Sequence, residues 1–211
     1  MIAQRQSSSL MDNIKSLEKE HHLITSERKE KLKMLALSIN EMMSTVDSAN
    51  VTFICTHNSR RSQLSEVWLR AAVDYFKIKG IRSYSGGTEA TAFNHRMVAA
   101  IDRFGFGVNI MNDGINPEYR INMSSDKSNG IKMFSKIYDH DYNPVKNYIA
   151  VMVCDQADKQ CPFIPGATER IALPYQDPKA YDDTPQESKA YDDKVREIGR
   201  EILYMIGYLA T

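Results

Sequence analysis

The sequence has no excess charge of either sign, few cysteines and no long apolar run. Its 27 lysines and arginines balance 27 aspartates and glutamates, so no overall field favours nucleic acid or an anionic membrane surface. The longest apolar run is far shorter than the roughly 20 residues that a membrane helix needs. The first residues lack the apolar core of a secretion signal. We therefore expect a protein that binds neither nucleic acid nor membranes.

Cysteine is scarce, with only Cys55, Cys154 and Cys161 in a chain of 211 residues. An odd number argues against a secreted disulfide framework and favours thiols that are kept reduced. This predicts a cytoplasmic protein. The length suffices for one sizeable domain and an appendage.

The most informative stretch joins a predicted strand to a predicted helix. Residues 51–54 form a short apolar, β-branched run typical of a buried strand, and from Ser62 onward apolar residues recur at helical spacing. The loop between them runs from Cys55 to Arg61. A strand–loop–helix junction directs backbone N–H groups and the positive end of the helix dipole at the loop. We therefore expect an anion-binding loop that begins with a cysteine.

The residue types in this loop suit nucleophilic chemistry on an oxyanion. A thiolate at Cys55 would be the nucleophile, and its position favours that form. Arg61 can bind two oxygens of a tetrahedral oxyanion at once. Ser62 can donate a hydrogen bond to the sulfur. A lone cysteine would more often be a buried core residue. Here a strand, a five-residue interval between Cys55 and Arg61, the Arg61-Ser62 pair and a following helix occur together, which favours a functional cysteine.

This stretch resembles the Cys-x5-Arg-Ser loop of the low-molecular-weight tyrosine phosphatases and of the thioredoxin-coupled arsenate reductases that share their fold. The resemblance implies that the loop residues bind the oxyanion. They are Thr56, His57, Asn58, Ser59, Arg60 and Arg61. Asn58 matches the asparagine of the family loop, whereas His57 stands where the family usually has glycine and Arg60 where it often has a second cysteine. Glycine permits backbone angles that histidine adopts only at a cost, so His57 bears on the detailed geometry of the loop but not on the role of Cys55.

Asp177 lies in an Asp-Pro pair after the last predicted strand. When Cys55 attacks, the departing oxygen needs a proton, and a carboxylic acid can supply it. The family carries its general acid in such a pair, which implies this role for Asp177. An Asp-Pro pair is otherwise common in ordinary turns.

Cys154 and Cys161 stand seven positions apart in a polar segment that Pro162 follows. The interval is too long for the usual Cys-x2–4-Cys metal hook, and no histidine lies close. The segment resembles the redox loop of thioredoxin-coupled arsenate reductases, which implies a relay from Cys55 to Cys154 to Cys161. Seven residues of helix rise about 10.5 Å, whereas disulfide-bonded Cα atoms lie about 4.4–6.8 Å apart. The segment must therefore be a loop or must unwind when it oxidises.

Asn58, Glu66 and Ser85 match positions that bind a potassium ion in some arsenate reductases. The alternative is that these three side chains form a hydrogen-bond network that shapes the loop. No other metal or bound cofactor is expected.

The rest of the pattern predicts an α/β fold. We expect a three-layer domain over residues 49–211 with a central, mostly parallel four-stranded sheet, preceded by a helical extension over residues 1–48. Its strands are expected over residues 51–54, 81–84, 148–153 and 170–173. Turn signals between short apolar runs predict a β-hairpin-like insertion over about residues 107–147, and Ser85-Gly86-Gly87 is expected to be a tight turn.

Three helices are predicted around this sheet in addition to the one that follows the loop. One begins near Thr25 or Ser26, with an apolar stripe of Leu32, Leu35, Ile39, Met42 and Val46. This stripe packs on its own domain or forms a dimer contact or docking surface. Asn94 and Gly105 bound a second helix. The last begins at Thr184-Pro185-Gln186-Glu187, which reads as a capping box. A short helix is also expected over residues 10–20.

The favoured function is arsenate reduction through Cys55, Cys154 and Cys161, with thioredoxin as the reductant. The alternative is a phosphomonoester hydrolase that acts through a Cys55–phosphate intermediate. A third hypothesis is an oxyanion-binding or redox-sensing module whose function lies in the amino-terminal extension, through which the chain could also form oligomers.

Overall fold

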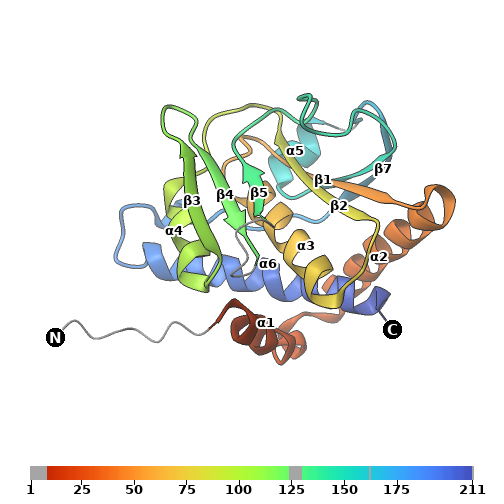
Figure 1. Ribbon diagram of the computed structural model, residues 1–211, viewed down its shortest axis with the longest axis horizontal. Helices are drawn as coiled ribbons and strands as arrows, with labels where there is room; N and C mark the ends of the chain where they lie inside the picture. Colours follow the sequence, from red (N-terminus) through yellow and green to blue (C-terminus); the bar gives the residue numbers. More distant parts are fainter. Residues whose placement is uncertain (1–8, 124–129, 162, 211) are drawn as a thin grey trace.

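A computed structural model describes residues 9–123, 130–161 and 163–210 (Figure 1). Its centre is a parallel sheet of four strands in the order β2-β1-β6-β7. The strands are β1 (Ala49–Cys55), β2 (Ile81–Gly87), β6 (Tyr148–Met152) and β7 (Ala167–Ala172). The predicted α/β architecture with a central parallel sheet is confirmed. The carboxyl ends of the two central strands, β1 and β6, therefore lie side by side.

Helices flank this sheet. They are α1 (Leu10–Glu18), α2 (Ser26–Val46), α3 (Arg61–Phe76), α4 (His95–Phe104), α5 (Asp155–Gln160) and α6 (Glu187–Leu209), with short 3-10 turns η1 (His21–Leu23) and η3 (Pro178–Tyr181). The long helix α6 runs beneath the sheet in Figure 1 and contacts α1, α2, α3 and α4. None of the helices in the described part of the chain has the length and apolarity that crossing a bilayer requires.

The amino-terminal helices pack on the same core as the sheet. The Thr25 hydroxyl caps α2 by accepting the Arg28 N–H at 3.2 Å, as its position predicted. Four residues of the predicted stripe are buried against α6 and β1 (Leu32, Leu35, Ile39 and Met42). Val46 is instead 52% exposed, because α2 ends there and the left-handed Asp47 turns the chain into β1. The core runs without interruption from α1 to α6, whereas the domain boundary at residue 48 stays a prediction.

The insertion forms a second, antiparallel sheet with strand order β3-β4-β5. Its strands are β3 (Gly107–Asn112), β4 (Glu118–Asn122) and β5 (Gly130–Met133). The predicted hairpin therefore has a third strand, β3, which the sequence did not reveal because it is largely exposed and shows no apolar alternation. Residues 124–129, which belong to the predicted insertion, lie outside the described residues.

The predicted tight turn at Ser85-Gly86-Gly87 was wrong. These residues are the end of β2, where Gly86 and Gly87 pair with Ile54 and Cys55 of β1. Glycine is required there by a close approach, since a Cβ on Gly86 would lie 2.3 Å from the Cα of Tyr138.

The predicted capping box from Thr184 to Glu187 was also wrong. The last helix begins at Glu187, and the Thr184 hydroxyl instead caps a turn before it by accepting the Gln186 N–H at 3.3 Å. The Glu187 carboxylate accepts the Asp183 N–H and pairs with Arg96 at 2.7 Å, which sets the start of the helix. The predicted helix over residues 95–104 is confirmed, with Asn94 as its cap and Gly105 at its end.

Candidate active site

Cys55 is the last residue of β1, and the loop to α3 curls around it. Its side chain is buried, and its Sγ lies 3.0 Å from Ser62 Oγ in the first turn of α3. The predicted strand, loop and helix are thus confirmed in their order. A thiolate at Cys55 would face the amino-terminal end of a 16-residue helix, where backbone N–H groups and the dipole stabilise negative charge.

Asn58 determines the shape of the loop. Its backbone is left-handed, with φ 45°, a conformation that asparagine tolerates. His57 is not among the residues with positive φ, so the loop does not require a backbone conformation there that favours glycine. The His57 side chain points outward and lies 3.6 Å from Glu89, while its carbonyl oxygen accepts a hydrogen bond from Ser135 Oγ at 2.9 Å.

The Asn58 side chain orders the hydroxyl groups near the sulfur. Its Nδ2 donates to Ser62 Oγ and to Ser85 Oγ, both at 2.9 Å. Its Oδ1 accepts the backbone N–H of Lys136 at 2.9 Å, which fixes the orientation of the amide. Because Ser62 Oγ already accepts from Asn58, its own hydrogen is free to point at Cys55 Sγ. This arrangement stabilises negative charge on the sulfur.

Arg61 and Asp177 meet at the mouth of the loop. Arg61 Nη2 lies 2.8 Å from Asp177 Oδ2, and Nη1 donates to the carbonyl oxygen of Tyr175 at 3.1 Å. Asp177 is 31% exposed and caps η3, which places the predicted general acid next to the predicted oxyanion-binding arginine. An oxyanion that binds Arg61 bidentately therefore competes with Asp177 for the guanidinium group.

The Arg60 side chain points away from the loop toward α6. Its Nε donates to Tyr191 Oη at 2.8 Å, and its Nη2 lies 3.4 Å from Asp182. Burial is the main cause that raises the pKa of Tyr191 to about 12, and its hydrogen bond to Asp182 adds to the shift. Arg60 therefore ties the loop to α6, and only its backbone N–H is available to an oxyanion. No sequence pattern had pointed to this connection.

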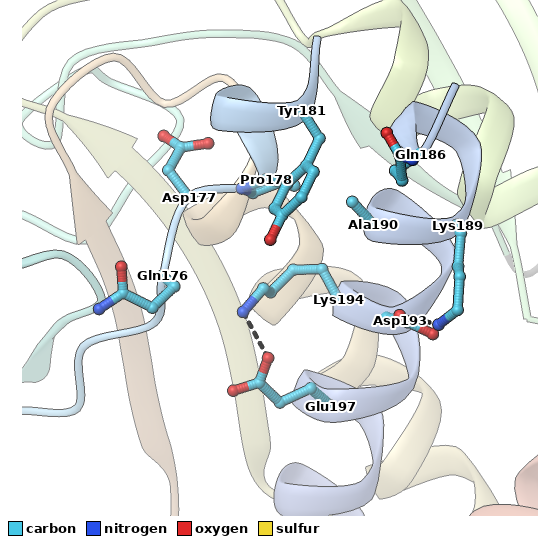
Figure 2. A pocket seen from close by; sticks show the side chains of 10 residues that line it. All are labelled: Gln176, Asp177, Pro178, Tyr181, Gln186, Lys189, Ala190, Asp193, Lys194 and Glu197. Atoms are coloured by element: carbon cyan, nitrogen blue, oxygen red, sulfur yellow. Dashed lines mark hydrogen bonds and ion pairs between the residues drawn. The ribbon is translucent and has the colours of Figure 1, made fainter. Parts of the chain in front are cut away.

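A cleft of about 390 Å³ opens beside Asp177, between η3 and α6. Figure 2 shows Asp177, Pro178 and Tyr181 on one side of it and side chains of α6 on the other, with the ion pair of Lys194 and Glu197 at its base. Because Asp177 lines this cleft, its side chain has room to move away from Arg61.

The two downstream cysteines bracket α5. Cys154 is buried at the end of β6, and its Sγ lies 3.6 Å from Oγ1 of Thr56, the residue after the nucleophile. The same Sγ caps α5 by accepting the Ala157 N–H at 3.3 Å. Cys161 is partly exposed at the far end of α5, where its N–H donates to the Ala157 carbonyl at 3.0 Å. Cys154 is thus next to the nucleophile loop, and Cys161 lies nearer the surface.

Because α5 is an intact helix, Cys154 and Cys161 cannot form a disulfide without its unwinding. Arg170 of β7 holds the helix at its carboxyl end. Its guanidinium donates to the Asp158 carboxylate at 2.6 Å and to the Cys161 carbonyl at 2.9 Å. Pro162, which follows in the sequence, lies outside the described residues.

The three residues expected at a potassium site are brought together, but with a lysine beside them. Glu66 and Ser85 are buried and hydrogen-bonded to each other, and Asn58 donates to Ser85. Burial raises the pKa of Glu66, while the Lys136 ammonium and the Ser85 hydroxyl oppose that shift. Lys136 Nζ lies 3.8 Å from Glu66 Oε2. A second cation beside this ammonium would be repelled, so these residues do not fit a potassium ion.

Comparisons with known proteins agree with this geometry, although no family model matches the chain. The arsenate reductase of Bacillus subtilis (strain 168) is 29% identical over 154 residues, which cover 72% of this chain and 91% of that protein. Arsenate reductase 2 of Staphylococcus epidermidis is 28% identical over 134 residues, which cover 63% and 81%. A low-molecular-weight phosphotyrosine phosphatase from Vibrio cholerae superimposes with a TM-score of 0.52 at 13% identity, covering 77% of this chain and 97% of that one. The chain therefore has the low-molecular-weight phosphotyrosine phosphatase fold and is related in sequence to bacterial arsenate reductases.

Proposed function

We propose that the protein is an arsenate reductase that passes electrons through Cys55, Cys154 and Cys161. The observation that carries the proposal is the position of Cys154, whose sulfur contacts the residue after the nucleophile. A phosphatase needs no second thiol there. The sequence similarity to arsenate reductases over most of their length supports the same substrate.

In the first step Cys55 forms a bond to arsenic. The loop N–H groups and Arg61 hold the arsenate oxyanion, and the Cys55 thiolate attacks the arsenic atom. One arsenic–oxygen bond breaks, and Asp177 gives the departing oxygen the proton it needs to leave as water. Because Asp177 is a carboxylate ion-paired with Arg61 at 2.8 Å in the structure, it releases Arg61 to the oxyanion and takes up a proton from water before it acts as an acid.

In the second step Cys154 attacks Cys55 Sγ. The sulfur–arsenic bond breaks, its electron pair stays on arsenic, and arsenite leaves as arsenic(V) becomes arsenic(III). The two thiols are oxidised to a Cys55–Cys154 disulfide, so two electrons are balanced. Cys161 then attacks Cys154 Sγ and frees the Cys55 thiolate, which leaves a Cys154–Cys161 disulfide. This last exchange requires α5 to unwind.

An external dithiol protein closes the cycle, and thioredoxin is the reductant we propose. Cys161 is the more exposed of the pair, so its sulfur is the one open to attack. The relay also needs thiols that are reduced between turnovers, which supports a cytoplasmic location and a role in arsenic detoxification.

Phosphomonoester hydrolysis is the second candidate, and the phosphatase fold and the Arg61–Asp177 pair favour it. Both reactions share the attack by Cys55 and protonation by Asp177. They differ in the second step, because water rather than Cys154 would resolve a Cys55–phosphate intermediate.

The test compares arsenite formation with aryl-phosphate hydrolysis in the wild type, Cys154→Ser and Cys161→Ser. We expect both variants to lose multiple-turnover arsenate reduction and to keep hydrolysis. Without Cys154 the enzyme should stall as an arsenic adduct, and without Cys161 it should release one arsenite and hold a Cys55–Cys154 disulfide. Asp155→Ser, at an exposed position beside Cys154, is the matched control and should keep both activities. Wild-type protein that forms no Cys154–Cys161 bond with arsenate, and variants that match it, would leave hydrolysis as the function.

A further inference from the structure

Lys136 is a fully buried lysine that the proposed chemistry does not use. Its side chain has no exposed area, and its ammonium has no hydrogen-bond partner among the described residues. Nζ lies 3.8 Å from the buried Glu66 carboxylate and 4.9 Å from the centre of the Phe134 ring. Tyr142 covers it from a further side, with its ring centre at 5.7 Å. Lysine is almost never buried in this way unless it is paired, so a reason for its position is required.

Glu66, the partner of Lys136, ends a row of hydrogen bonds that begins at the nucleophile. Cys55 Sγ contacts Ser62 Oγ, and Ser62 Oγ and Ser85 Oγ both accept from the Asn58 amide. Each hydroxyl group has one hydrogen, so the hydrogen of Ser62 is left for the sulfur and that of Ser85 for the Glu66 carboxylate. The donor and acceptor roles along this row of hydrogen bonds therefore depend on Glu66 accepting from Ser85.

Lys136 holds this row at two points. Its backbone N–H donates to Asn58 Oδ1 at 2.9 Å and so fixes which way the amide faces. Its ammonium balances the charge of Glu66 at the other end. A buried carboxylate without a partner is strongly unfavourable, so loss of the ammonium would disturb the acceptor on which Ser85 and Asn58 depend.

We propose that Lys136 is a positioning residue whose ammonium is a built-in cation for the oxyanion loop. It belongs to the inserted segment, in the chain that follows the end of β5 at Met133, which gives that insertion a role in the site. An ammonium carries the single positive charge that a potassium ion would bring to Asn58, Glu66 and Ser85. The loop is thereby held without any dissolved cation.

The proposal rests on the oxyanion-binding loop of the proposed function, and it is the same whether arsenate or a phosphoester binds. Phosphate binding by wild-type protein is therefore measured first, by calorimetry. A wild type that does not bind phosphate would overturn the proposed function and the role of Lys136 together. A wild type that binds phosphate, with Lys136 variants that match it, would overturn the role of Lys136 alone.

Lys136→Met keeps the length of the side chain and removes its charge. We expect a fall of about 10- to 100-fold in kcat/KM for aryl-phosphate hydrolysis, the range found when the outer hydrogen-bond partners that orient metal ligands are removed. Lys132→Met is the matched control. Lys132 belongs to the same insertion and lies 5.1 Å from the same Phe134 ring, but it pairs with Glu118 and is more than a third exposed. Its kcat/KM should stay within twofold of the wild type.

A double variant separates the charge pair from general packing. Lys136→Met/Glu66→Gln removes both charges, and we expect its kcat/KM to lie closer to the wild type than that of Lys136→Met, because no buried charge is left alone. Losses that simply add would contradict the pairing. This comparison also serves if Lys136→Met folds poorly, since the double variant has no uncompensated charge.

Rescue by added cations is the readout that a purely structural lysine would not give. Lys136→Ala should be slow in tetramethylammonium chloride and several-fold faster in methylammonium or potassium chloride at the same ionic strength, since only the smaller cations fit the vacated space. Wild-type activity should be equal in all three salts. A Lys136→Ala protein that is folded by thermal melting, yet equally slow in every salt, would overturn the proposal.

Discussion

Replacing Asp177 by asparagine should strengthen phosphate binding while it slows turnover. Arg61 is ion-paired with Asp177 at 2.8 Å, so a bound oxyanion first displaces this carboxylate. Asp177 is 31% exposed, and a pair in such a position contributes about 0.2–1 kcal/mol. Since about 1.4 kcal/mol corresponds to tenfold in affinity, Asp177→Asn should lower the Kd for phosphate by about 1.4- to 5-fold.

The same substitution should lower the rate of turnover, although it strengthens phosphate binding. Loss of a general acid costs about 10²- to 10⁴-fold, and the loss should be largest for aryl phosphates whose leaving groups are most basic. Calorimetry with phosphate and a leaving-group series measure the two effects. Asp183→Asn is the control, because it removes the same charge from the same segment but pairs with Arg96 rather than Arg61. Weaker phosphate binding by Asp177→Asn, or equal losses across the series, would refute the competition between Asp177 and the oxyanion.

Three further substitutions test the oxyanion-binding arginine, the end of α5 and the packing of α2. Arg61→Lys should lower kcat/KM for both arsenate and aryl phosphate by more than about 100-fold, because a point charge cannot bind two oxygens in the planar geometry of guanidinium; an unchanged rate would remove Arg61 from the site. Arg170→Ala should speed formation of the Cys154–Cys161 disulfide in thiol-trapping experiments, since it frees the end of α5 held at Asp158 and Cys161, and a slower step would contradict unwinding as the barrier. Leu35→Ala should lower the free energy of unfolding by about 2–5 kcal/mol. Leu37 is 55% exposed on the same helix, so Leu37→Ala should change this free energy by less than about 0.5 kcal/mol. Equal effects in denaturant titrations would show that α2 is not part of the core.

The parts of the site that lie close together in the chain were predictable from the sequence. Cys55, Ser62 and the start of α3 are fixed by one strand–loop–helix junction, in which local patterns agree with the final fold. The presence of Asp177 beside the loop agrees with the role that the family resemblance implied for its Asp-Pro pair, although its ion pair with Arg61 was not predicted.

The missed features depend on contacts between distant segments. Gly86 and Gly87 signal a turn locally, but the approach of Tyr138 makes them part of a strand. Lys136 lies 70 positions from Glu66, and nothing in its immediate neighbourhood marks it as buried. Arg60 likewise reaches Tyr191 on the last helix, a partner that no periodicity indicates. Such pairings are set by tertiary packing, which a single sequence does not encode in any local pattern.

The short helix α5 links folding to redox chemistry in the proposed relay. The dithiol form of Cys154 and Cys161 contains α5, and the disulfide form cannot, so the folding free energy of this helix is part of the reduction potential of the pair. For a two-electron couple, about 1.4 kcal/mol of helix stability corresponds to about 30 mV. Each contact that stabilises α5 therefore makes the Cys154–Cys161 disulfide a stronger oxidant. The contacts of Arg170 with Asp158 and Cys161 then favour the transfer of electrons from the reductant to the enzyme.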